Sequence, residues 1–356
     1  MNPRWREALR EAGRNLVSGT THVWRWTLVL ALILGGLAWL ETSTIRTVVN
    51  NAADHVSRGG ATWVLQATGG IWGTSCDQLA KADGVLASGA LRVEDESLTA
   101  IVLPRGPVPV KSVTPGFLSL IGASDATGLV VSDLVANRLS MTTPAQLSTT
   151  TGVIEVTGHY PYPEDGRRPG LGFAALAPVP GDQAFDECWL TVWPSDDQIT
   201  GLAYLALIGG GSSAASEAKL AQMNPRFSTS LDTTSQYESR LTRWSGVAAA
   251  SAGILLGFAA CWQRRLEVAS SIHVGLPRSF LLIRLEAEAA VWALAAGLLA
   301  APMIVVGSWS AASDLRAVQW AGARVLLAGV AGPLLGTLVA WTGIRQRQLF
   351  ALFKTR

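Results

Sequence analysis

Side chains that commonly carry out catalysis or bind metal ions are few in this sequence of 356 residues. They comprise four histidines and three cysteines: His22, His55, His159, His273, Cys76, Cys188 and Cys261. A metal site built from Cys76, Cys188, His55 and His159 would lack the C-x-x-C and H-x-x-H spacings common in such sites. A dispersed Ser-His-Asp triad using His159 stays open, although the G-x-S-x-G and H-E-x-x-H motifs are missing. A surface or packed histidine is the preferred interpretation.

The sequence also lacks the loop that binds nucleotide phosphates. Such a loop reads G-x-x-x-x-G-K-[ST] and opens a helix. The glycine-rich run Gly209–Ser213 has no Lys-Ser/Thr pair after it, so it predicts a flexible connection. The sequence therefore predicts that this chain is not an enzyme, has no ATPase motif of its own, and holds no cofactor or metal.

Charged residues are scarce and unevenly placed. They make up 15% of the sequence, whereas a soluble protein has about 25%. Four stretches contain no Asp, Glu, Lys or Arg: 26–40, 244–262, 289–313 and 325–344. A helix rises about 1.5 Å per residue and the hydrocarbon core of a bilayer is about 30 Å thick, so each of the last three can cross once. The first can also cross if Arg25 and Glu41 snorkel toward the interfaces. The predicted spans are 23–45, 244–262, 289–313 and 325–344.

The first stretch could instead belong to a cleaved signal peptide. Such a peptide has a basic start, an apolar core of about 7–15 residues and a small-x-small cleavage site. Here 25 residues precede the core, which ends in Ala38-Trp39-Leu40-Glu41. A retained membrane helix is the preferred interpretation.

The positions of Lys and Arg predict the orientation in the membrane. Segments 1–25, 263–288 and 345–356 hold five, four and four of them, whereas 41–243 has 13 basic and 20 acidic residues. Basic loops stay in the cytoplasm. We therefore expect a multi-pass protein of the cell membrane, with a cytoplasmic helix at 1–22, a cytoplasmic loop at 263–288, a short external loop at 314–324 and a cytoplasmic tail at 345–356. Residues 46–243 lie outside.

Short β-rich runs and two helical runs in the external segment predict an α+β domain. The runs typical of strands are Ser97–Leu103, Val108–Val113, Gly152–His159, Gly172–Ala177 and Glu187–Trp193. Ser195-Asp196-Asp197 is a capping cluster before a helix at Ile199–Ile208, and Ala214–Met223 is a second helical run. The predicted fold class is a membrane α-helical protein with four transmembrane helices and an α+β extracytoplasmic domain inserted between helices 1 and 2.

The cysteines fit this topology. Cys76 and Cys188 both lie in the external segment, where an oxidising compartment permits a disulfide, and Cys261 lies at the cytoplasmic end of the second span. We predict a Cys76–Cys188 disulfide with Cys261 free. Two solitary buried thiols are the alternative.

The loop between the second and third spans mixes charged and apolar residues. Gln263–Ala269 continues the second span with charge, Gly275 and Pro277 then break the helix, and Ser279–Glu288 starts a new amphipathic run. The apolar residues among the arginines are Leu266, Val268, Ala269 and Ile272. A solvated basic loop would not need them, whereas a short cytoplasmic helix that meets a protein partner would.

This loop resembles the cytoplasmic signature of MacB/FtsX-like permeases of ABC transporters, approximately R-x-x-E-[IV]-[GA]-x-x-x-A-x-G followed by an E-A pair. The matching residues are Arg264, Glu267, Val268, Ala269, Gly275, Leu276, Glu286 and Ala287. His273-Val274 and Pro277 depart from the signature. The plan of one span, a large external domain and three further spans is also similar to that family.

Three further segments resemble the same family. Outside, Val113–Gly122 and Val130–Ala136 look like two of its short motifs, although Thr143-Pro144-Ala145 stands where Gly-Asp often follows. Before the first span, Trp5–Val17 interleaves charged and apolar residues, as the amphipathic elbow helix of the family does.

The resemblance implies a permease subunit that works with a second permease copy or a sister permease and with two cytoplasmic ABC ATPase subunits. ATP and Mg would bind to those ATPase partners. Movement of a coupling helix would reach the external domains and drive export or extraction of a peptide, antibiotic, lipid or lipoprotein. The residues expected to bind the ATPase are Arg264, Arg265, Glu267, Val268, Ala269, Ile272, Gly275, Leu276 and Arg278.

Two other functions stay open at this point. One is an FtsX-like transmembrane signal transmitter that activates an external cell-wall hydrolase. The other is a membrane receptor or an external enzyme that works without an ATPase. No nucleic-acid partner is expected, because the overall charge of +2 reflects the asymmetry across the membrane.

Overall fold

The structure, a computed structural model, describes residues 3–19, 21–123, 126–209, 218–311 and 314–344. The chain divides into two units. Unit 1 is Met1–Asn51 together with Thr233–Arg356, and unit 2 is Ala52–Asp232. The long apolar helices form unit 1, and a sheet with short helices forms unit 2.

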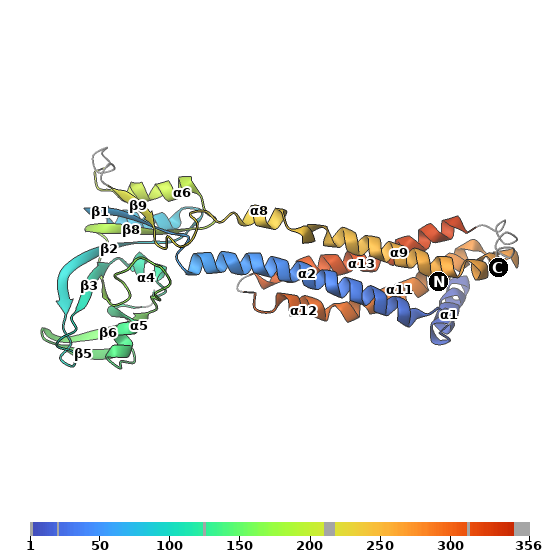
Figure 1. Ribbon diagram of the computed structural model, residues 1–356, viewed down its shortest axis with the longest axis horizontal. Helices are drawn as coiled ribbons and strands as arrows, with labels where there is room; N and C mark the ends of the chain where they lie inside the picture. Colours follow the sequence, from blue (N-terminus) through green and yellow to red (C-terminus); the bar gives the residue numbers. More distant parts are fainter. Residues whose placement is uncertain (1–2, 20, 124–125, 210–217, 312–313, 345–356) are drawn as a thin grey trace. The chain divides into compact units, whose positions relative to one another are not determined.

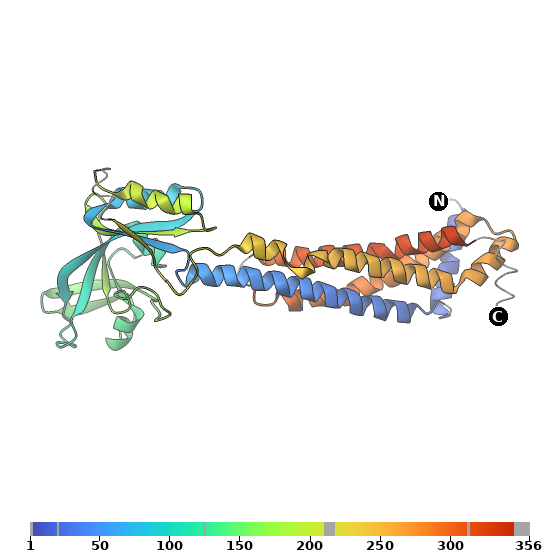
Figure 2. The same cartoon turned by 45° about the horizontal axis from the view of Figure 1, so that its top comes forward.

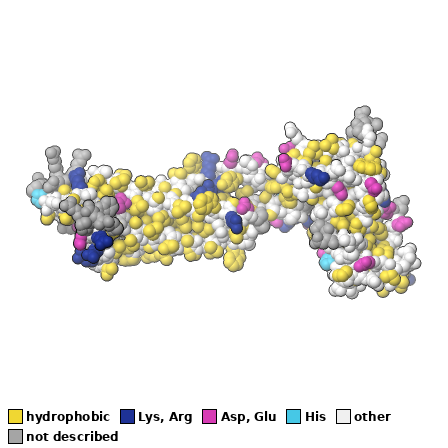
Figure 3. Space-filling view, turned by 180° about the vertical axis from the view of Figure 1, so that it is seen from behind, with side chains coloured by type: hydrophobic (Ala, Val, Ile, Leu, Met, Phe, Trp, Pro, Cys, Tyr) yellow, Lys and Arg dark blue, Asp and Glu magenta, His cyan; other side chains and the backbone are white. Residues whose placement is uncertain are grey.

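Unit 1 is a helical bundle. Its elements are α1 Pro3–Val17, α2 Val23–Ser57, α8 Thr233–Glu238, η3 Leu241–Trp244, α9 Ser245–Gln263, α10 Arg265–His273, α11 Arg278–Ala300, α12 Pro302–Ser308 and α13 Leu315–Gly343. Four segments of the described chain are long and apolar enough to cross a membrane: α2, Leu241–Gln263, Arg278–Ser308 and α13. α2, α9, α11 and α13 run side by side, and α1 lies across the end of the bundle where α2 begins (Figure 1 and Figure 2). Hydrophobic side chains cover most of the bundle surface seen in Figure 3.

The four segments that can cross a membrane are longer than the uncharged stretches from which the spans were predicted. α2 continues past Ile45 to Ser57, so its last residues, from Ala52, belong to unit 2. α11 begins at Arg278, and the predicted loop over 314–324 is wrong because α13 begins at Leu315. A charged residue need not end a helix, because its side chain can find a partner or water while the backbone hydrogen bonds continue. The predicted tail 345–356 lies outside the described residues.

Glycines let α9 and α13 approach each other closely. They are Gly253 and Gly257 on α9, and Gly329, Gly332 and Gly336 on α13. A Cβ atom added to Gly253 would lie 2.6 Å from the carbonyl oxygen of Gly329, and one added to Gly332 would lie 2.6 Å from that of Ala250. Both helices carry a pair of glycines four residues apart, which is the spacing of close helix packing in membranes. Our sequence predictions did not use this signal.

Unit 2 is built on one mixed sheet of nine strands in the order β5-β6-β4-β7-β3-β2-β8-β1-β9. The strands are β1 Thr62–Trp72, β2 Val85–Leu98, β3 Val108–Val113, β4 Leu129–Ser132, β5 Ala145–Thr149, β6 Gly152–Tyr160, β7 Ala175–Pro178, β8 Ala184–Val192 and β9 Lys219–Gln222. β3 pairs with β7 in parallel and β4 with β6 in parallel, and the other pairs are antiparallel. The helices between them are α3 Gly73–Gln78, η1 Leu79–Lys81, α4 Pro115–Leu120, α5 Asp133–Arg138, α6 Asp197–Gly201 and η2 Leu202–Ala206.

Separate hydrophobic cores stabilise the two ends of the sheet. Near β1 and β8, buried residues such as Leu65, Phe185 and Leu190 pack together. At the other end, Val131 and Val156 belong to a different core. Figure 1 shows β2 and β3 bending between these two parts of unit 2. Four membrane helices and a mixed α/β sheet domain confirm the predicted fold class.

The predicted strands were only partly right. β3 and β6 match the runs 108–113 and 152–159, and β7 and β8 overlap the runs 172–177 and 187–193. The run Ser97–Leu103 is wrong, because β2 ends at Leu98 and the chain then turns. The second helical run is also wrong: Lys219–Gln222 is a strand, because pairing with β1 satisfies its backbone groups. Residues 210–217 lie outside the described chain, and with them most of the predicted Gly209–Ser213 connection.

A disulfide joins Cys76 of α3 to Cys188 of β8, which confirms the predicted pairing. Both cysteines are fully buried, and Cys261 is buried and free within the described chain. Because the Cys76 and Cys188 sulfurs are both oxidised, they cannot act as thiolate ligands of a metal.

Mapping of peptides without reduction should therefore yield one linked pair containing Cys76 and Cys188. Alkylation of unfolded but unreduced protein should label Cys261 alone, since only that residue carries a thiol. Reduction before alkylation is the control and should label all three cysteines. Label on Cys76 or Cys188 in unreduced protein would contradict the pairing.

Candidate partner-coupling site

The loop between the second and third spans forms a short helix, α10, that follows α9 after a single bend. Arg264 is at the bend, with φ −96° and ψ 11°, and it both ends α9 and precedes α10. Gly275 follows α10 with φ +95°, a left-handed backbone that glycine adopts without strain. Its amide donates to the carbonyl of Ile272 and the amide of Leu276 donates to Ser271, which is a Schellman motif. Pro277 then precedes α11, so the predicted helix break at Gly275 and Pro277 is confirmed.

Six polar side chains from α1, the bend, α10 and α11 make a set of contacts that is closed through the backbone of α1, and we name it the polar ring. Its members are Glu11 and Asn15 of α1, Arg264 at the bend, Glu267 of α10, and Arg284 and Glu288 of α11. Arg284 lies 2.7 Å from Glu11 and 3.1 Å from Glu267. Arg264 lies 2.7 Å from Glu267 and also pairs with Glu288. Asn15 donates to Glu288 over 2.8 Å, and it follows Glu11 by four residues on one face of α1, which closes the ring.

Burial differs along the polar ring, and two of its six members are buried. Arg284 and Glu288 are 3% and 4% exposed, whereas 46% of the Glu267 side chain is exposed. Burial by itself would raise the pKa of Glu267, but the hydrogen bonds and charges of Arg264 and Arg284 outweigh burial and hold that pKa below its ordinary value. Glu267 is therefore ionised at neutral pH, and its ion pair with Arg284 ties α10 to α11.

Two of the residues expected to contact a partner are inside the bundle. Val268 and Ala269 are fully buried in a core that also contains Cys261 and Leu285. They hold α10 against the membrane helices, which corrects the expectation that they face a partner. A short helix at the end of a bundle needs one apolar face for this purpose.

The other expected contacts differ in exposure. Arg264 and Glu267 belong to the polar ring, and Arg265 and Ile272 are half-buried. Gly275, Leu276 and Arg278 are exposed, and they belong to the continuously exposed segment His273–Ser279, which we name the tip. The tip is the longest exposed run of this loop, in which Gln263, Glu267 and Ser270 are also exposed.

Sequence reasoning missed four members of the polar ring. Glu11 and Asn15 are four residues apart on α1, and Arg284 and Glu288 are four residues apart on α11. This spacing places each pair on one face of its helix. Polar pairs so placed on one helix face indicate a partner, but the sequence does not say which helix supplies it.

A second buried ion pair joins α2 to the segment before α9. Glu41 Oε1 lies 3.2 Å from Arg240 Nη2, and only 4% and 9% of these side chains are exposed. The Arg240 guanidinium also lies 3.6 Å from the centre of the Tyr237 ring. The expectation that Glu41 snorkels is therefore wrong: a buried carboxylate is tolerated here because an arginine neutralises it.

The unit 2 motif at Val113–Gly122 forms a packed corner. Thr114 donates to Asp77 and accepts from the Ala90 amide at 2.9 Å, and the Gly116 amide donates to Asp77 at 3.3 Å. Burial raises the pKa of Asp77, against these hydrogen bonds, which lower it. Phe117 then meets Trp189 edge to face, with ring centres 5.3 Å apart. These contacts give the motif a role in packing.

The second unit 2 motif, Val130–Ala136, contains the cap of a helix. β4 runs into α5, and Ser132 Oγ accepts from the Val135 amide at 3.4 Å. On the same part of unit 2, His159 lies 2.9 Å from Thr143 and 3.7 Å from Asp133, with half of its side chain exposed. His159 therefore makes surface contacts with a threonine and an aspartate. No three His, Cys, Asp or Glu residues within the described ranges are grouped to hold a metal.

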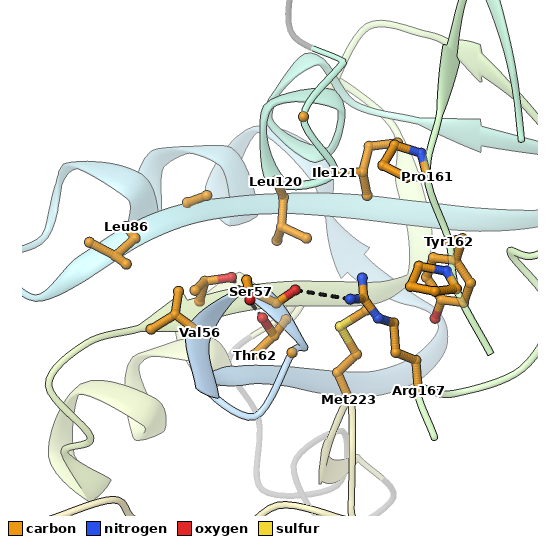
Figure 4. Close-up of a pocket in the computed structure, with 15 residues that line it drawn as sticks. Val56, Ser57, Thr62, Leu86, Leu120, Ile121, Pro161, Tyr162, Arg167 and Met223 are labelled. Atoms are coloured by element: carbon orange, nitrogen blue, oxygen red, sulfur yellow. Dashed lines mark hydrogen bonds between the residues drawn. The ribbon is translucent and has the colours of Figure 1, made fainter. Parts of the chain in front are cut away.

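Unit 2 contains a cavity of about 570 Å³ at the end of α2 (Figure 4). Leu86, Leu120, Tyr162 and Met223 are among the residues that line it. Of the described residues around it, Arg167 alone is charged. Its guanidinium pairs with Asp165 at 3.0 Å and donates to the carbonyl of Ser57 at 2.9 Å. Burial raises the pKa of Tyr162 to about 12, so this phenol stays neutral. The cavity suits an apolar group.

Comparison with known proteins gives only distant similarities. No protein-family model matches the chain, and no curated protein matches it. Among solved structures, the periplasmic region of MacB from Actinobacillus actinomycetemcomitans is similar at 8% identity and a TM-score of 0.35, covering 53% of this chain and 99% of that one. The extracellular domain of the noncanonic ABC-type transporter YknZ from Gram-positive bacteria is similar at 16% identity and a TM-score of 0.28, covering 40% and 88%. Both TM-scores are too low to define the fold of this chain.

Proposed function

We propose that this chain is the permease subunit of a MacB-like ABC transporter. In this proposal a separate ATPase subunit hydrolyses ATP and binds Mg, and the permease couples that hydrolysis to movement of external domains, which exports or extracts a peptide, antibiotic, lipid or lipoprotein. The observation that carries the proposal is the construction of the loop between the second and third spans. It is a short helix fixed to two others by the polar ring, and it ends in the exposed tip His273–Ser279.

A connecting loop would not need such construction. Ion pairs hold α10 to α11, and α11 to α1, so displacement of the tip is transmitted to helices that enter the bundle. The match of Arg264 and Glu267 to the permease signature supports the same reading, and these two residues pair with each other at 2.7 Å. Arg264 and Glu267 therefore position the coupling element, while the tip is the surface proposed to meet the ATPase.

Variants of the tip test this assignment. Leu276→Asp combined with Arg278→Glu should weaken association with an ABC ATPase subunit encoded beside this chain at least tenfold, or about 1.4 kcal/mol. The reason is that Leu276→Asp would bury a carboxylate in the contact with the ATPase, and Arg278→Glu would reverse a charge there. Co-purification of the two co-expressed subunits and the ATP turnover of the complex are the measurements. Both tip residues are exposed, so insertion and folding should be unaffected.

Arg105→Glu in unit 2 is the matched control, since Arg105 is also exposed and lies far along the chain from the tip. It should leave association unchanged. Glu267 is a poor test residue, because its reversal would break two ion pairs within the chain. Wild-type association of the tip variant, or ATP hydrolysis by the purified chain alone, would contradict the proposal.

A further inference from the structure

An apolar groove runs along the bundle where α2 lies beside α11 and α12. It consists of two adjoining hollows of about 450 and 460 Å³ that share Leu28 and Leu299. The first hollow begins at Leu16, at the end of α1, and includes Trp24. The second continues to Trp39 and Met303. The groove therefore starts at the junction of α1 with α2 and extends along the first span.

The groove is open to the side of the bundle. Its lining side chains Leu32, Leu299 and Trp24 are 77%, 59% and 62% exposed. These residues belong to helices that are long and apolar enough to cross a membrane. An acyl chain is the natural occupant of an apolar groove on such a surface, because hydrocarbon surrounds membrane helices there.

One arginine lies where the groove begins, and three more lie on α1, the helix that ends there. The Arg25 guanidinium lies 5.4 Å from the centre of the Trp24 ring, so this cation stands over a residue that lines the groove. On α1, Arg6, Arg10 and Arg14 follow each other at intervals of four residues and are all exposed. Arg10 makes one exposed ion pair, with Glu7 at 3.5 Å.

The orientation of α1 is fixed, which keeps its arginines on the outside. Ala8 and Ala12 are buried, and Glu11 and Asn15 bond to α11 through the polar ring. The face that carries the three arginines therefore points away from the bundle. α1 also lies across the bundle end in both ribbon views (Figure 1 and Figure 2), as a helix in the plane of a membrane interface would lie. Figure 3 shows Lys and Arg side chains at this end.

We propose that this corner is a binding site for one anionic phospholipid. The acyl chain lies in the groove between α2 and α11, and the phosphate headgroup meets Arg25 and the arginine face of α1. Charge complementarity selects an anionic headgroup, since each Arg near the surface favours acidic lipids. A second copy of this chain seated here would bring like-charged arginine faces together. The proposal concerns a resident lipid and holds whatever cargo the permease carries.

The test uses the full chain, purified in a neutral detergent at low salt. Phosphatidylglycerol and phosphatidylcholine, each with a fluorescent label on one acyl chain, are titrated and followed by fluorescence anisotropy. Wild-type protein should bind phosphatidylglycerol at least tenfold more tightly than phosphatidylcholine. In 0.5 M salt this preference should shrink, because charges at the surface are screened. Glycerol phosphate, which has the charge without the chains, should not displace the labelled lipid at equal concentration.

Two variants separate the headgroup from the chain. In the first variant, Arg10→Gln/Arg14→Gln/Arg25→Gln, the ratio of the dissociation constants of the two lipids should fall close to one. The control variant, Arg105→Gln/Arg138→Gln/Arg226→Gln, removes the same charge from exposed positions in unit 2 and should keep the wild-type ratio. Gly36→Ile should weaken both lipids alike, because Gly36 lines the groove and an added Cβ there meets no atom within 4 Å. Equal binding of both lipids to wild type, an unchanged preference in the first variant, or displacement by glycerol phosphate would overturn the proposal.

Discussion

Replacing Gly336 by Val should force α9 and α13 apart and lower the free energy of unfolding of unit 1 by about 3 kcal/mol or more. A Cβ atom at Gly336 would overlap the carbonyl oxygen of Ile254 on α9. Backbone atoms of one helix cannot move aside without moving the whole helix, so the neighbouring Gly332 contact would be lost as well. The change should be visible as a large loss of helix stability in detergent during denaturant titration followed by circular dichroism.

Gly246 provides the matched control on α9. An added Cβ there meets no atom within 4 Å, so Gly246→Val should change the free energy of unfolding by no more than about 0.5 kcal/mol. Gly336→Ala should have an intermediate effect, because alanine adds only the overlapping Cβ. If Gly336→Val and Gly246→Val are equally stable, the close approach of α9 and α13 is not what holds this part of the bundle.

Arg264→Leu should destabilise unit 1 by about 3–5 kcal/mol, because it leaves the Glu288 carboxylate buried without its cation. Only 5% of the Glu288 side chain is exposed, and Asn15 would be its one remaining partner in the polar ring. The double variant Arg264→Leu/Glu288→Leu should recover most of the loss, since apolar residues can replace a buried ion pair with little cost. Thermal unfolding in detergent at constant lipid content is the measurement.

Arg278→Leu is the control for this series, because Arg278 lies on the exposed tip outside the polar ring. The free energy of unfolding of this variant should be within about 0.5 kcal/mol of that of the wild type. A double variant no more stable than Arg264→Leu would mean that Arg264 acts through the helix bend alone. Wild-type stability of Arg264→Leu would show that the ring does not fix α10 to the bundle.

The sequence predicted what depends on composition and local spacing. Uncharged stretches located the four membrane helices, and the Gly275 and Pro277 pair located the end of α10. The capping cluster at 195–197 was also correct, since Asp196 accepts from the amides of Gln198 and Ile199. Each of these features is decided by residues close together in the chain.

Features decided by distant residues could not be predicted in this way. Glu11 and Arg284 are 273 positions apart, and no local pattern says that they meet. The strand β9 forms because it pairs with β1, which lies far earlier in the chain. Gly69-Gly70 interrupts β1, so the alternation of apolar and polar residues expected of a strand is not visible there. The end of α2 and the start of α13 were misplaced because uncharged stretches were used to mark the spans. The helices themselves continue through charged residues, Arg46 in α2 and Arg324 in α13.

The two covalent connections between unit 1 and unit 2 are mechanically unlike. On one side α2 is a single helix of 35 residues, about 52 Å long, that enters unit 2 without a break. On the other side the chain returns through residues 223–232, which form no helix or strand and contain Pro225. A change in the direction of α2 would require backbone hydrogen bonds of the helix to break, whereas residues 226–232 could change their backbone dihedral angles without breaking a helix or a strand. The two connections therefore differ in stiffness.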